Sequence, residues 1–303
     1  MNYNVLFSVI IPQRNSVSTL SRLFASIPDR DDIEIIVVDN TPIPITKEEV
    51  GIDREYQLLW SAPERHAGGA RNVGIENAHG KWLLFADADD YYADGAFDVF
   101  FSKVDSDAEI IYTGMGGIYL DTGERSDRGD VYAKLVHEYV EGKRTEEDLR
   151  FGFASPCCKM ISHDLVDRYN LKYDEIRAGN DAYFSLASGC YAKKIDAVDV
   201  ISYIATVSRG TLTRRRDYEV TKARLYSKLH CNQFLKAHGY PNMQRSVMNH
   251  LYESRRLGIK VFFEFCGMIM RFRQNPFIGW NRWFLSFRRN RKKEQKEAKY
   301  IVN

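Results

Sequence analysis

The sequence predicts an α/β fold, in which a mostly parallel β-sheet is flanked by helices and followed by a helical C-terminal extension. In the first hundred residues, short apolar runs alternate with amphipathic segments. Beyond about Arg214 the pattern is helical to the end of the chain. Near-continuous apolar strands separated by helices are typical of a parallel sheet that is covered on both faces.

The individual elements follow from the same periodicities. Strands are expected where apolar runs are bounded by polar or turn residues, at residues 5–11, 33–39, 56–60, 81–86, 109–114, 116–121 and 193–206. Helices are expected where apolar residues recur at spacings of three and four, at about residues 20–27, 67–78, 131–139, 180–189 and 222–239. We place a boundary near Arg216, which separates a domain of residues 1–215 from an extension of residues 216–303.

Composition excludes several classes of protein. The 303 residues are 44% hydrophobic and 13% aromatic, which excludes global disorder. The formal net charge is +2, and the last third of the chain is basic whereas the first third is not. Five cysteines without CxxC spacing argue against a disulfide framework or structural zinc, and favour a reducing compartment. The N-terminus resembles a strand more than a signal peptide, and no apolar stretch is long enough to span a membrane. We therefore expect a cytoplasmic protein.

Three loops are expected to meet at one edge of the sheet. Residues 12–15, 39–42 and 87–90 each follow an apolar strand. Ligands of parallel α/β sheets collect at the carboxyl ends of the strands, so these loops predict a common binding crevice.

The loop after the fourth strand is acidic. The run WLLFADADD ends in Asp87, Asp89 and Asp90. In an extended segment, residues two apart point the same way, so Asp87 and Asp89 are expected to face one ligand. Their hard oxygen atoms suit Mg²⁺ or Mn²⁺ together with a substrate phosphate. The alternative is an acidic turn in which Asp90 or Asp94 caps the next helix.

A segment before that strand predicts a phosphate contact. Gly68 and Gly69 lead into a helix that carries Arg71 and Asn72 on its first turn. Glycine allows close backbone approach, and a helix N-terminus with a guanidinium attracts phosphate. The alternative is an ordinary loop with Arg71 in solvent.

These motifs, in this order, resemble a known family. SVIIPQRN, EIIVVDN, GGARNVGIENAHGKWLLFADADD and KMISHDLVDRYNLKYDEIRAGNDAYF together resemble the family 2 glycosyltransferases with the GT-A fold, over about residues 5–213. Such enzymes often assemble bacterial capsule, O-antigen or exopolysaccharide. The resemblance implies a nucleotide-sugar donor (a UDP-sugar is favoured), a divalent cation (Mn²⁺ or Mg²⁺) and inverting transfer. It also implies a donor-binding half at about residues 1–92 and an acceptor-binding half at about 93–215.

The resemblance assigns roles to residues of the donor half. It implies that Pro12 and Asn15 line the nucleoside pocket, that Asp39 binds the base and that Arg71 approaches the nucleotide. Asp87 and Asp89 would form the D-x-D pair, with Asp89 the stronger candidate for metal contact. The sequence departs from the family pattern in two places, because PQRN lacks the usual tyrosine and VDNTP replaces D-D-G-S.

The acceptor half contains the expected base. RAGNDAYF occupies the place where the family has Glu-Asp at the start of a helix, so Asp181 is the candidate general base and Asn180 replaces the glutamate. The alternative is that Asn180 or Asp181 caps that helix. Lys159 is a possible acceptor-side residue, although a solvated or structural lysine accounts for it equally well.

The C-terminal extension is aromatic and basic. No acidic residue interrupts the sequence from Phe265 to Lys293, and residues 280–293 favour contact with an anionic membrane surface. A helix packed on the catalytic domain with a solvated tail is the alternative. We expect a glycan or lipid-linked glycan acceptor, and nothing upstream supports nucleic-acid binding.

Two other functions are alternatives for this sequence. Sugar-nucleotide pyrophosphorylases also have carboxylates after a strand, but they carry a glycine-rich loop after the first strand, where this chain has PQRNSVSTL. A non-catalytic subunit that binds a nucleotide sugar or scaffolds a membrane complex is the second alternative, and the presence of Asp89 and Asp181 argues against it.

Overall fold

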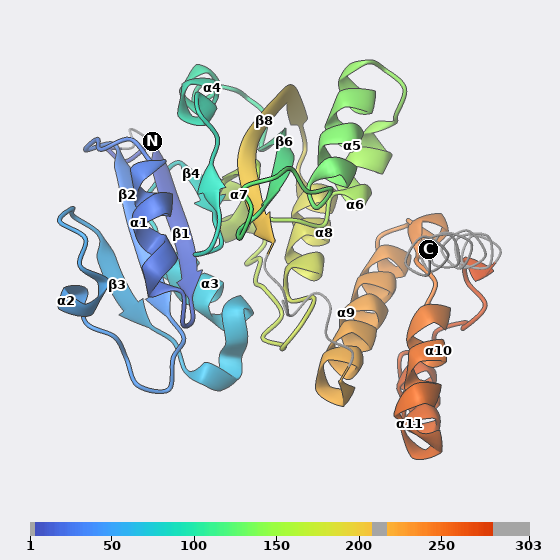
Figure 1. The fold of residues 1–303 in the computed structure, drawn as a ribbon. Coiled ribbons are helices and arrows are strands. Elements are labelled where there is room, and N and C mark those ends of the chain that lie inside the picture. Colours follow the sequence, from blue (N-terminus) through green and yellow to red (C-terminus); the bar gives the residue numbers. More distant parts are fainter. Residues whose placement is uncertain (1–3, 208–216, 281–303) are drawn as a thin grey trace, which may run out of the picture. The chain divides into compact units, whose positions relative to one another are not determined.

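The computed structural model describes residues 4–207 and 217–280. The chain divides into two compact units, Met1–Arg214 and Arg215–Asn303, which are described separately. Figure 1 shows the elements of both units in sequence colours.

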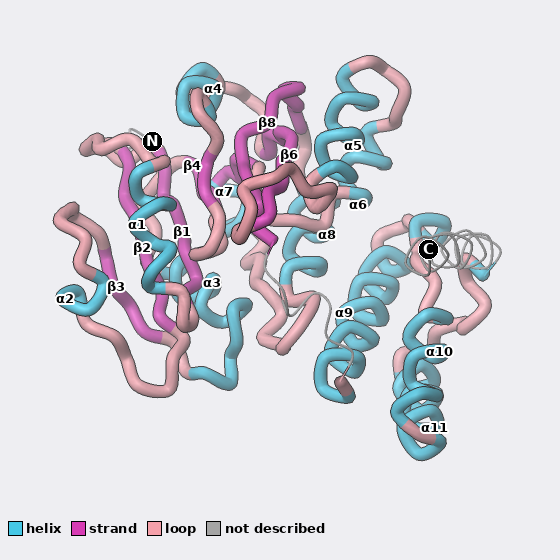
Figure 2. The backbone as a smooth tube through the Cα atoms, in the orientation of Figure 1, coloured by secondary structure: helices cyan, strands magenta, loops and turns pink. Residues whose placement is uncertain are grey.

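One eight-stranded mixed sheet organises the described part of the first unit (Figures 1 and 2). Its order is β3-β2-β1-β4-β7-β6-β8-β5, in which β3, β2, β1 and β4 run parallel and β7 is antiparallel to both of its neighbours. The strands are β1 (Phe7–Gln13), β2 (Ile33–Asp39), β3 (Gln57–Trp60), β4 (Trp82–Phe85), β5 (Tyr91–Tyr92), β6 (Ile110–Tyr119), β7 (Lys159–Ser162) and β8 (Ile195–Val207). The parallel half places the ends of β1, β2 and β4 at one edge, as predicted.

Helices connect the strands of this sheet. They are α1 (Val17–Ala25), α2 (Lys47–Val50), α3 (His66–Glu76), α4 (Ala96–Ser102), α5 (Asp130–Val140), α6 (Glu146–Gly152), α7 (His163–Arg168) and α8 (Asp181–Tyr191), with a short 3₁₀ helix, η1 (Pro63–Arg65), before α3. Helix α3 packs closely on β1, because an ideal Cβ on Gly74 would lie 2.4 Å from a methyl group of Ile10. Fully buried residues such as Ile10 and Phe85 form the centre of this packing.

Strand β6 differs from the prediction. The two strands expected at 109–114 and 116–121 are a single strand, β6, which pairs in parallel with β8. The register shifts on both sides of Gly114, so β-bulge-like irregularities absorb the mismatch and the ladder continues. The extra residues lie on β8, so β8 is the bulged strand and β6 continues through its glycines.

The second unit is helical over its described residues. It contains α9 (Tyr218–Ala237), η3 (Pro241–Met243), α10 (Met248–Leu257) and α11 (Ile259–Arg271). Its core consists of the buried residues Leu225, Leu229, Val247, Phe265 and Ile269. In the parts of the chain that the structure describes, no helix is long and apolar enough to cross a membrane.

We predict that Gly68→Ala destabilises the first unit. An ideal Cβ on Gly68 would lie 2.1 Å from the backbone oxygen of Asp174, so α3 and the loop before α8 must separate. The free energy of unfolding is expected to fall by about 1–3 kcal/mol in denaturant titrations. The matched control is Gly267→Ala on α11, where nothing lies within 4 Å of the added atom, and it should stabilise the second unit by up to about 1 kcal/mol. Unchanged stability in Gly68→Ala would contradict this packing.

Candidate active site

The acidic loop after β4 is a turn. Asp90 N donates to Asp87 O at 3.0 Å, so residues 87–90 reverse direction immediately after the strand. The expectation that Asp87 and Asp89 share one face of an extended segment was wrong, because strand alternation ends at Phe85. The two carboxylates nevertheless interact, since the charge of Asp87 contributes to the raised pKa of Asp89.

Side chains from two distant elements hold the backbone of this turn. Thr19 Oγ1 on α1 donates to Ala88 O at 2.7 Å, and Arg22 on the same helix donates to Asp89 O at 2.6 Å. Thr206 Oγ1 on β8 donates to the same Asp89 carbonyl at 2.7 Å. The direction of the turn is therefore fixed before any ligand binds.

Asp90 is a structural carboxylate. It is 3% exposed and accepts hydrogen bonds from Tyr203 OH (3.0 Å) and Thr206 N (2.7 Å). Tyr203 OH in turn accepts from Asp87 N at 2.8 Å. Burial, with the charges of Asp87 and Asp89, raises the pKa of Asp90 well above its ordinary value. It does not cap the next helix, because the N-cap residue of α4 is Gly95.

Asp89 is the carboxylate that a ligand can reach. It is half-buried, and the hydrogen bonds from other described residues go to its backbone carbonyl. Burial and the neighbouring Asp87 raise its pKa, so its charged form lacks a full counter-charge. A divalent cation would supply that charge, and the residues present fit one. Across residues 4–207 and 217–280, no group of three or more His, Cys, Asp or Glu side chains could hold a metal. A cation would therefore need substrate oxygens as well as Asp89 and Asp87, which is common for Mg²⁺.

Arg71 is buried at 5% exposure and links the two halves of the site. It donates to Asp87 Oδ1 at 2.5 Å and to Asn180 Oδ1 at 3.1 Å, and its guanidinium lies 5.3 Å from the ring centroid of Tyr173. Burial lowers the pKa of Arg71, but Asp87 and other neighbouring groups outweigh burial, and the net shift is upward. The alternative of a solvated Arg71 is therefore wrong.

The two glycines do not lead into the helix. Helix α3 begins at His66, so Gly68 and Gly69 lie inside its first turn. Gly68 lacks a Cβ where Asp174 O approaches, and Gly69 lies against the side chain of Arg65. Their absent side chains allow close packing between parts of the protein, which accounts for both glycines without a phosphate.

Asp181 is the first residue of α8, directly after Asn180. No side chain caps this helix, and the Asn180 amide instead binds Arg71 and Ile176 O. Burial raises the pKa of Asp181, while the charge of Arg71 opposes the rise and that of Asp87 adds to it. A carboxyl group with a raised pKa at the edge of a site is suited to proton transfer.

Asp39 is 1% exposed and is held by neighbouring donors. Its Oδ1 accepts from Gln13 Nε2 (3.0 Å) and Thr41 N (3.2 Å). Its Oδ2 accepts from Ile45 N (3.0 Å) and lies 2.6 Å from Thr41 Oγ1, whose one proton is shared with Ile43 O. A carboxylate has about four acceptor positions, and internal donors occupy at least three of them. In this structure Asp39 organises the loop after β2.

Two other expected donor residues lie beside that loop. Pro12 pairs in register with Val38 on β2, and Asn15 is exposed with a left-handed φ of 56°. Gln13 was missed by sequence reasoning, although it is 1% exposed and contacts Asp39. Its only sequence signal is its place inside the PQRN motif.

Lys159 lies in the core and cannot contact an acceptor directly. It is 1% exposed, its Nζ donates to Phe153 O at 2.8 Å, and it lies 4.7 Å from the centroid of the Phe153 ring. The possible acceptor-side role is corrected accordingly: Lys159 supports the segment before β7 from inside the protein. Burial lowers its pKa to about 7, opposed by Cys158 and Asp181.

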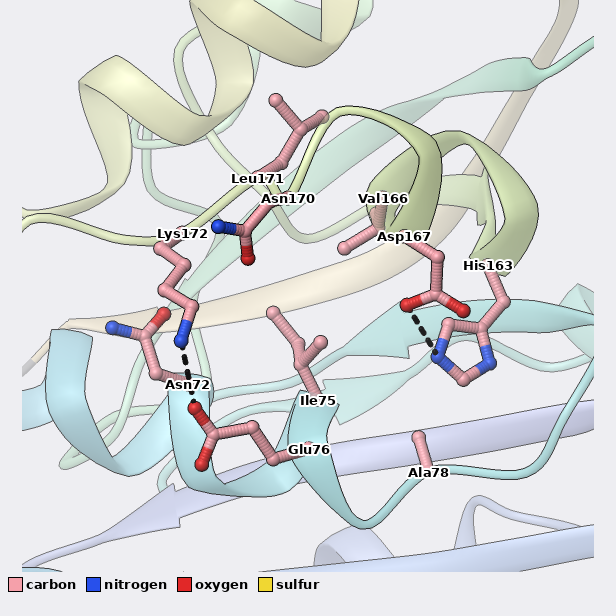
Figure 3. Close-up of a pocket in the computed structure, with 10 residues that line it drawn as sticks. All are labelled: Asn72, Ile75, Glu76, Ala78, His163, Val166, Asp167, Asn170, Leu171 and Lys172. Atoms are coloured by element: carbon pink, nitrogen blue, oxygen red, sulfur yellow. Dashed lines mark hydrogen bonds and ion pairs between the residues drawn. The ribbon is translucent and has the colours of Figure 1, made fainter.

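A cavity of about 270 Å³ lies at the opposite edge of the sheet (Figure 3). Ser162, at the end of β7, pairs with Trp82 at the start of β4, whereas Asp87 follows the end of β4. The cavity is lined by residues of α3, of α7 and of the segment after α7, among them the ion pairs Lys172–Glu76 and His163–Asp167. It is distinct from the carboxylate site.

Comparison with known proteins identifies the class to which this fold and site belong. The sequence profile described as Glycosyl transferase family 2 matches residues 8–169, and the chain belongs to this family. It is 27% identical over 222 residues to the succinoglycan biosynthesis protein ExoO of Rhizobium meliloti, covering 68% of this chain and 62% of ExoO. The matches to the first two curated relatives cover 55% and 62% of their lengths, so the chain spans little more than half of each.

A second relative has known structures. Poly(ribitol-phosphate) beta-N-acetylglucosaminyltransferase TarS of Staphylococcus aureus is 36% identical over 93 residues, covering 28% of this chain and 16% of TarS. The crystal structure of TarS residues 1–349 in complex with UDP-GlcNAc matches with a TM-score of 0.61 at 18% identity, covering 88% of this chain and 81% of that chain. The predicted α/β GT-A fold is confirmed.

We predict that Tyr203→Phe weakens the turn. The lost hydroxyl group leaves the backbone N–H of Asp87 without its acceptor. It also leaves the buried carboxylate of Asp90 without one of its donors. The unfolding free energy of the first unit is expected to fall by about 1–3 kcal/mol in urea titrations. Tyr119→Phe, at a position that is 36% exposed, is the matched control and should change little. Equal stability of Tyr203→Phe and the unmodified protein would contradict this role.

We predict that the buried Lys159 makes the free energy of unfolding depend on pH. Its pKa is about 7 in the folded protein and near its ordinary value of about 10.4 in the unfolded chain. Between these values only the unfolded chain binds the proton, so stability rises with pH, by about 1 kcal/mol for each pH unit. Lys159→Met should lack this contribution in unfolding titrations at pH 7 and pH 9. A constant difference between the two proteins would show that the folded lysine is charged throughout.

Proposed function

We propose that the chain is a metal-dependent, inverting glycosyltransferase. It would move a sugar from a nucleotide diphosphate donor, with a UDP-sugar favoured, to a hydroxyl group of a glycan or lipid-linked glycan in surface polysaccharide synthesis. The family supports glycosyl transfer, ExoO is a succinoglycan biosynthesis protein, and TarS binds UDP-GlcNAc. The observation that carries the proposal is Arg71, which joins the D-x-D turn to the residue before Asp181 through two hydrogen bonds.

On the donor side, Asp89 and Asp87 would hold Mn²⁺ or Mg²⁺ together with the donor diphosphate. The cation, when bound, would stabilise the negative charge of the departing nucleoside diphosphate, so no protein acid is required. The turn would keep Asp89 directed at this position, because Thr19 binds Ala88 O while Arg22 and Thr206 bind Asp89 O. Arg71 supplies the counter-charge of Asp87 and fixes its orientation.

On the acceptor side, Asp181 would act as the general base. The acceptor oxygen forms a bond to the anomeric carbon as the bond from that carbon to the diphosphate oxygen breaks, and the hydroxyl proton passes to the Asp181 carboxylate. Attack from the face opposite the diphosphate inverts the anomeric configuration. The raised pKa of Asp181 makes its carboxylate a stronger base than an ordinary aspartate.

The nucleoside would bind beside Pro12 and Asn15 at the ends of β1 and β2. Because Asp39 is buried and accepts at least three internal hydrogen bonds, base binding would rely mainly on other groups or on a rearranged loop after β2. A cytoplasmic location on the inner face of the cell membrane remains part of the proposal. The segment 280–293, which predicted membrane contact, lies outside the described residues beyond Trp280.

We predict that the purified protein slowly hydrolyses one donor in a panel of UDP-, GDP- and dTDP-sugars, and that chelator abolishes the reaction. Asp89→Asn should lower the rate about 10²-fold or more, because charge stabilisation of the leaving group is lost. With an acceptor present, Asp181→Asn should lower kcat about 10²- to 10⁴-fold and leave donor binding unchanged.

The matched control is Asp94→Asn, because Asp94 is an exposed carboxylate close to the turn in sequence. It should retain activity. If the folded protein binds and turns over no donor under any metal, catalysis is contradicted and a scaffold function takes its place.

A further inference from the structure

Helix α11 is apolar on two opposite sides. On its inner side, Phe265 and Ile269 are buried in the core of the second unit. On its outer side, Ile259, Phe263 and Met270 are 66%, 65% and 71% exposed. A surface helix normally has one apolar stripe, and a helix that is apolar on both sides is normally covered on both. The core of this unit covers only the inner side.

The exposed residues form one continuous stripe. Ile259, Phe263 and Met270 are spaced by four and seven residues, which places them on one face of the helix. Gly267 lies beside this stripe, with nothing within 4 Å of an added Cβ. After the helix, Phe277 and Trp280 are also 64% and 47% exposed. We call Ile259, Phe263 and Met270 the outer α11 face.

Basic side chains outnumber acidic ones in this part of the second unit. Residues 248–280 contain two acidic side chains, Glu253 and Glu264, and the five exposed basic side chains Arg255, Arg256, Lys260, Arg271 and Arg273, of which Lys260 and Arg271 lie on α11 itself. The carboxylate of Glu264 is compensated, because it binds Lys222 Nζ and Tyr218 OH. The segment that carries the outer α11 face therefore has a net positive charge.

We propose that the outer α11 face binds the interface of an anionic lipid membrane. Its apolar side chains would enter the boundary between headgroups and acyl chains, and Lys260 and Arg271 would lie at the level of the anionic headgroups. The positive charge favours an anionic membrane over a second copy of the chain, because a second copy seated on the same face would bring two basic surfaces together. The proposal is independent of catalysis and of the segment beyond Trp280.

The test is binding of the full chain to vesicles in a sedimentation assay. Phosphatidylglycerol–phosphatidylcholine vesicles are compared with pure phosphatidylcholine vesicles. We expect binding to the anionic vesicles that weakens as salt is raised. The double variant Phe263→Glu with Met270→Glu should lower the partition coefficient about tenfold or more. The matched control is Val131→Glu, an apolar position on α5 that is 62% exposed, and it should bind like the unmodified protein.

A second variant separates charge from apolar contact. Lys260→Gln with Arg271→Gln should lower binding to anionic vesicles about fivefold or more, without loss of helix content. Three results would overturn the proposal: equal binding by the Phe263→Glu, Met270→Glu variant; a dimer that this variant dissociates, which would identify a second copy as the occupant; or unfolding of the second unit in this variant, which would show that the chain itself covers the face.

Discussion

The buried guanidinium of Arg71 is the constraint on which the rest of the site depends. Three carboxylates occur within four residues after β4, and like charges so close repel one another. The structure treats each one differently. Asp87 is neutralised by Arg71, and Asp90 is buried against Tyr203 and Thr206. Asp89 keeps a half-buried carboxylate without a full counter-charge, which makes it the candidate metal ligand. The three carboxylates therefore differ in role: Asp90 holds the turn, Asp87 is an ion-pair partner and Asp89 is a candidate metal ligand.

The same arginine connects residues of the candidate site that are far apart in sequence. Through Asn180, Arg71 fixes the start of α8, where Asp181 lies. Asp87 and the start of α8 are therefore held in one network, which in the proposed reaction would reduce the reorganisation needed during transfer. An outer α11 face bound to lipid would add a separate property, because it would bring the catalytic unit to the surface at which lipid-linked acceptors reside.

Local patterns predicted much of this architecture. Apolar runs and their polar ends correctly placed β1, β2 and β4 and the edge at which their loops meet, because strand burial is a local property of sequence. The turn at residues 87–90 could not be predicted, because it depends on Tyr203 and Thr206, more than 100 residues away. Long-range packing likewise buries Lys159. The Asp39 carboxylate is held mainly by Thr41 and Ile45 of its own loop, in a loop conformation that no apolar periodicity specifies. The exposure of Phe263 could not be predicted either, because it depends on Phe265 and Ile269 being the side chains of α11 that fill the core.

The most direct test of this account is a double-mutant cycle on the unfolding free energy of the first unit, with Arg71→Met, Asp87→Asn and the combined variant. Each single variant leaves one partner without its counter-charge, and Arg71 is the more deeply buried partner. The account predicts a coupling energy of about 1–3 kcal/mol, with the double variant more stable than the sum of the single effects implies. Additivity within about 0.5 kcal/mol would contradict the central place of this ion pair.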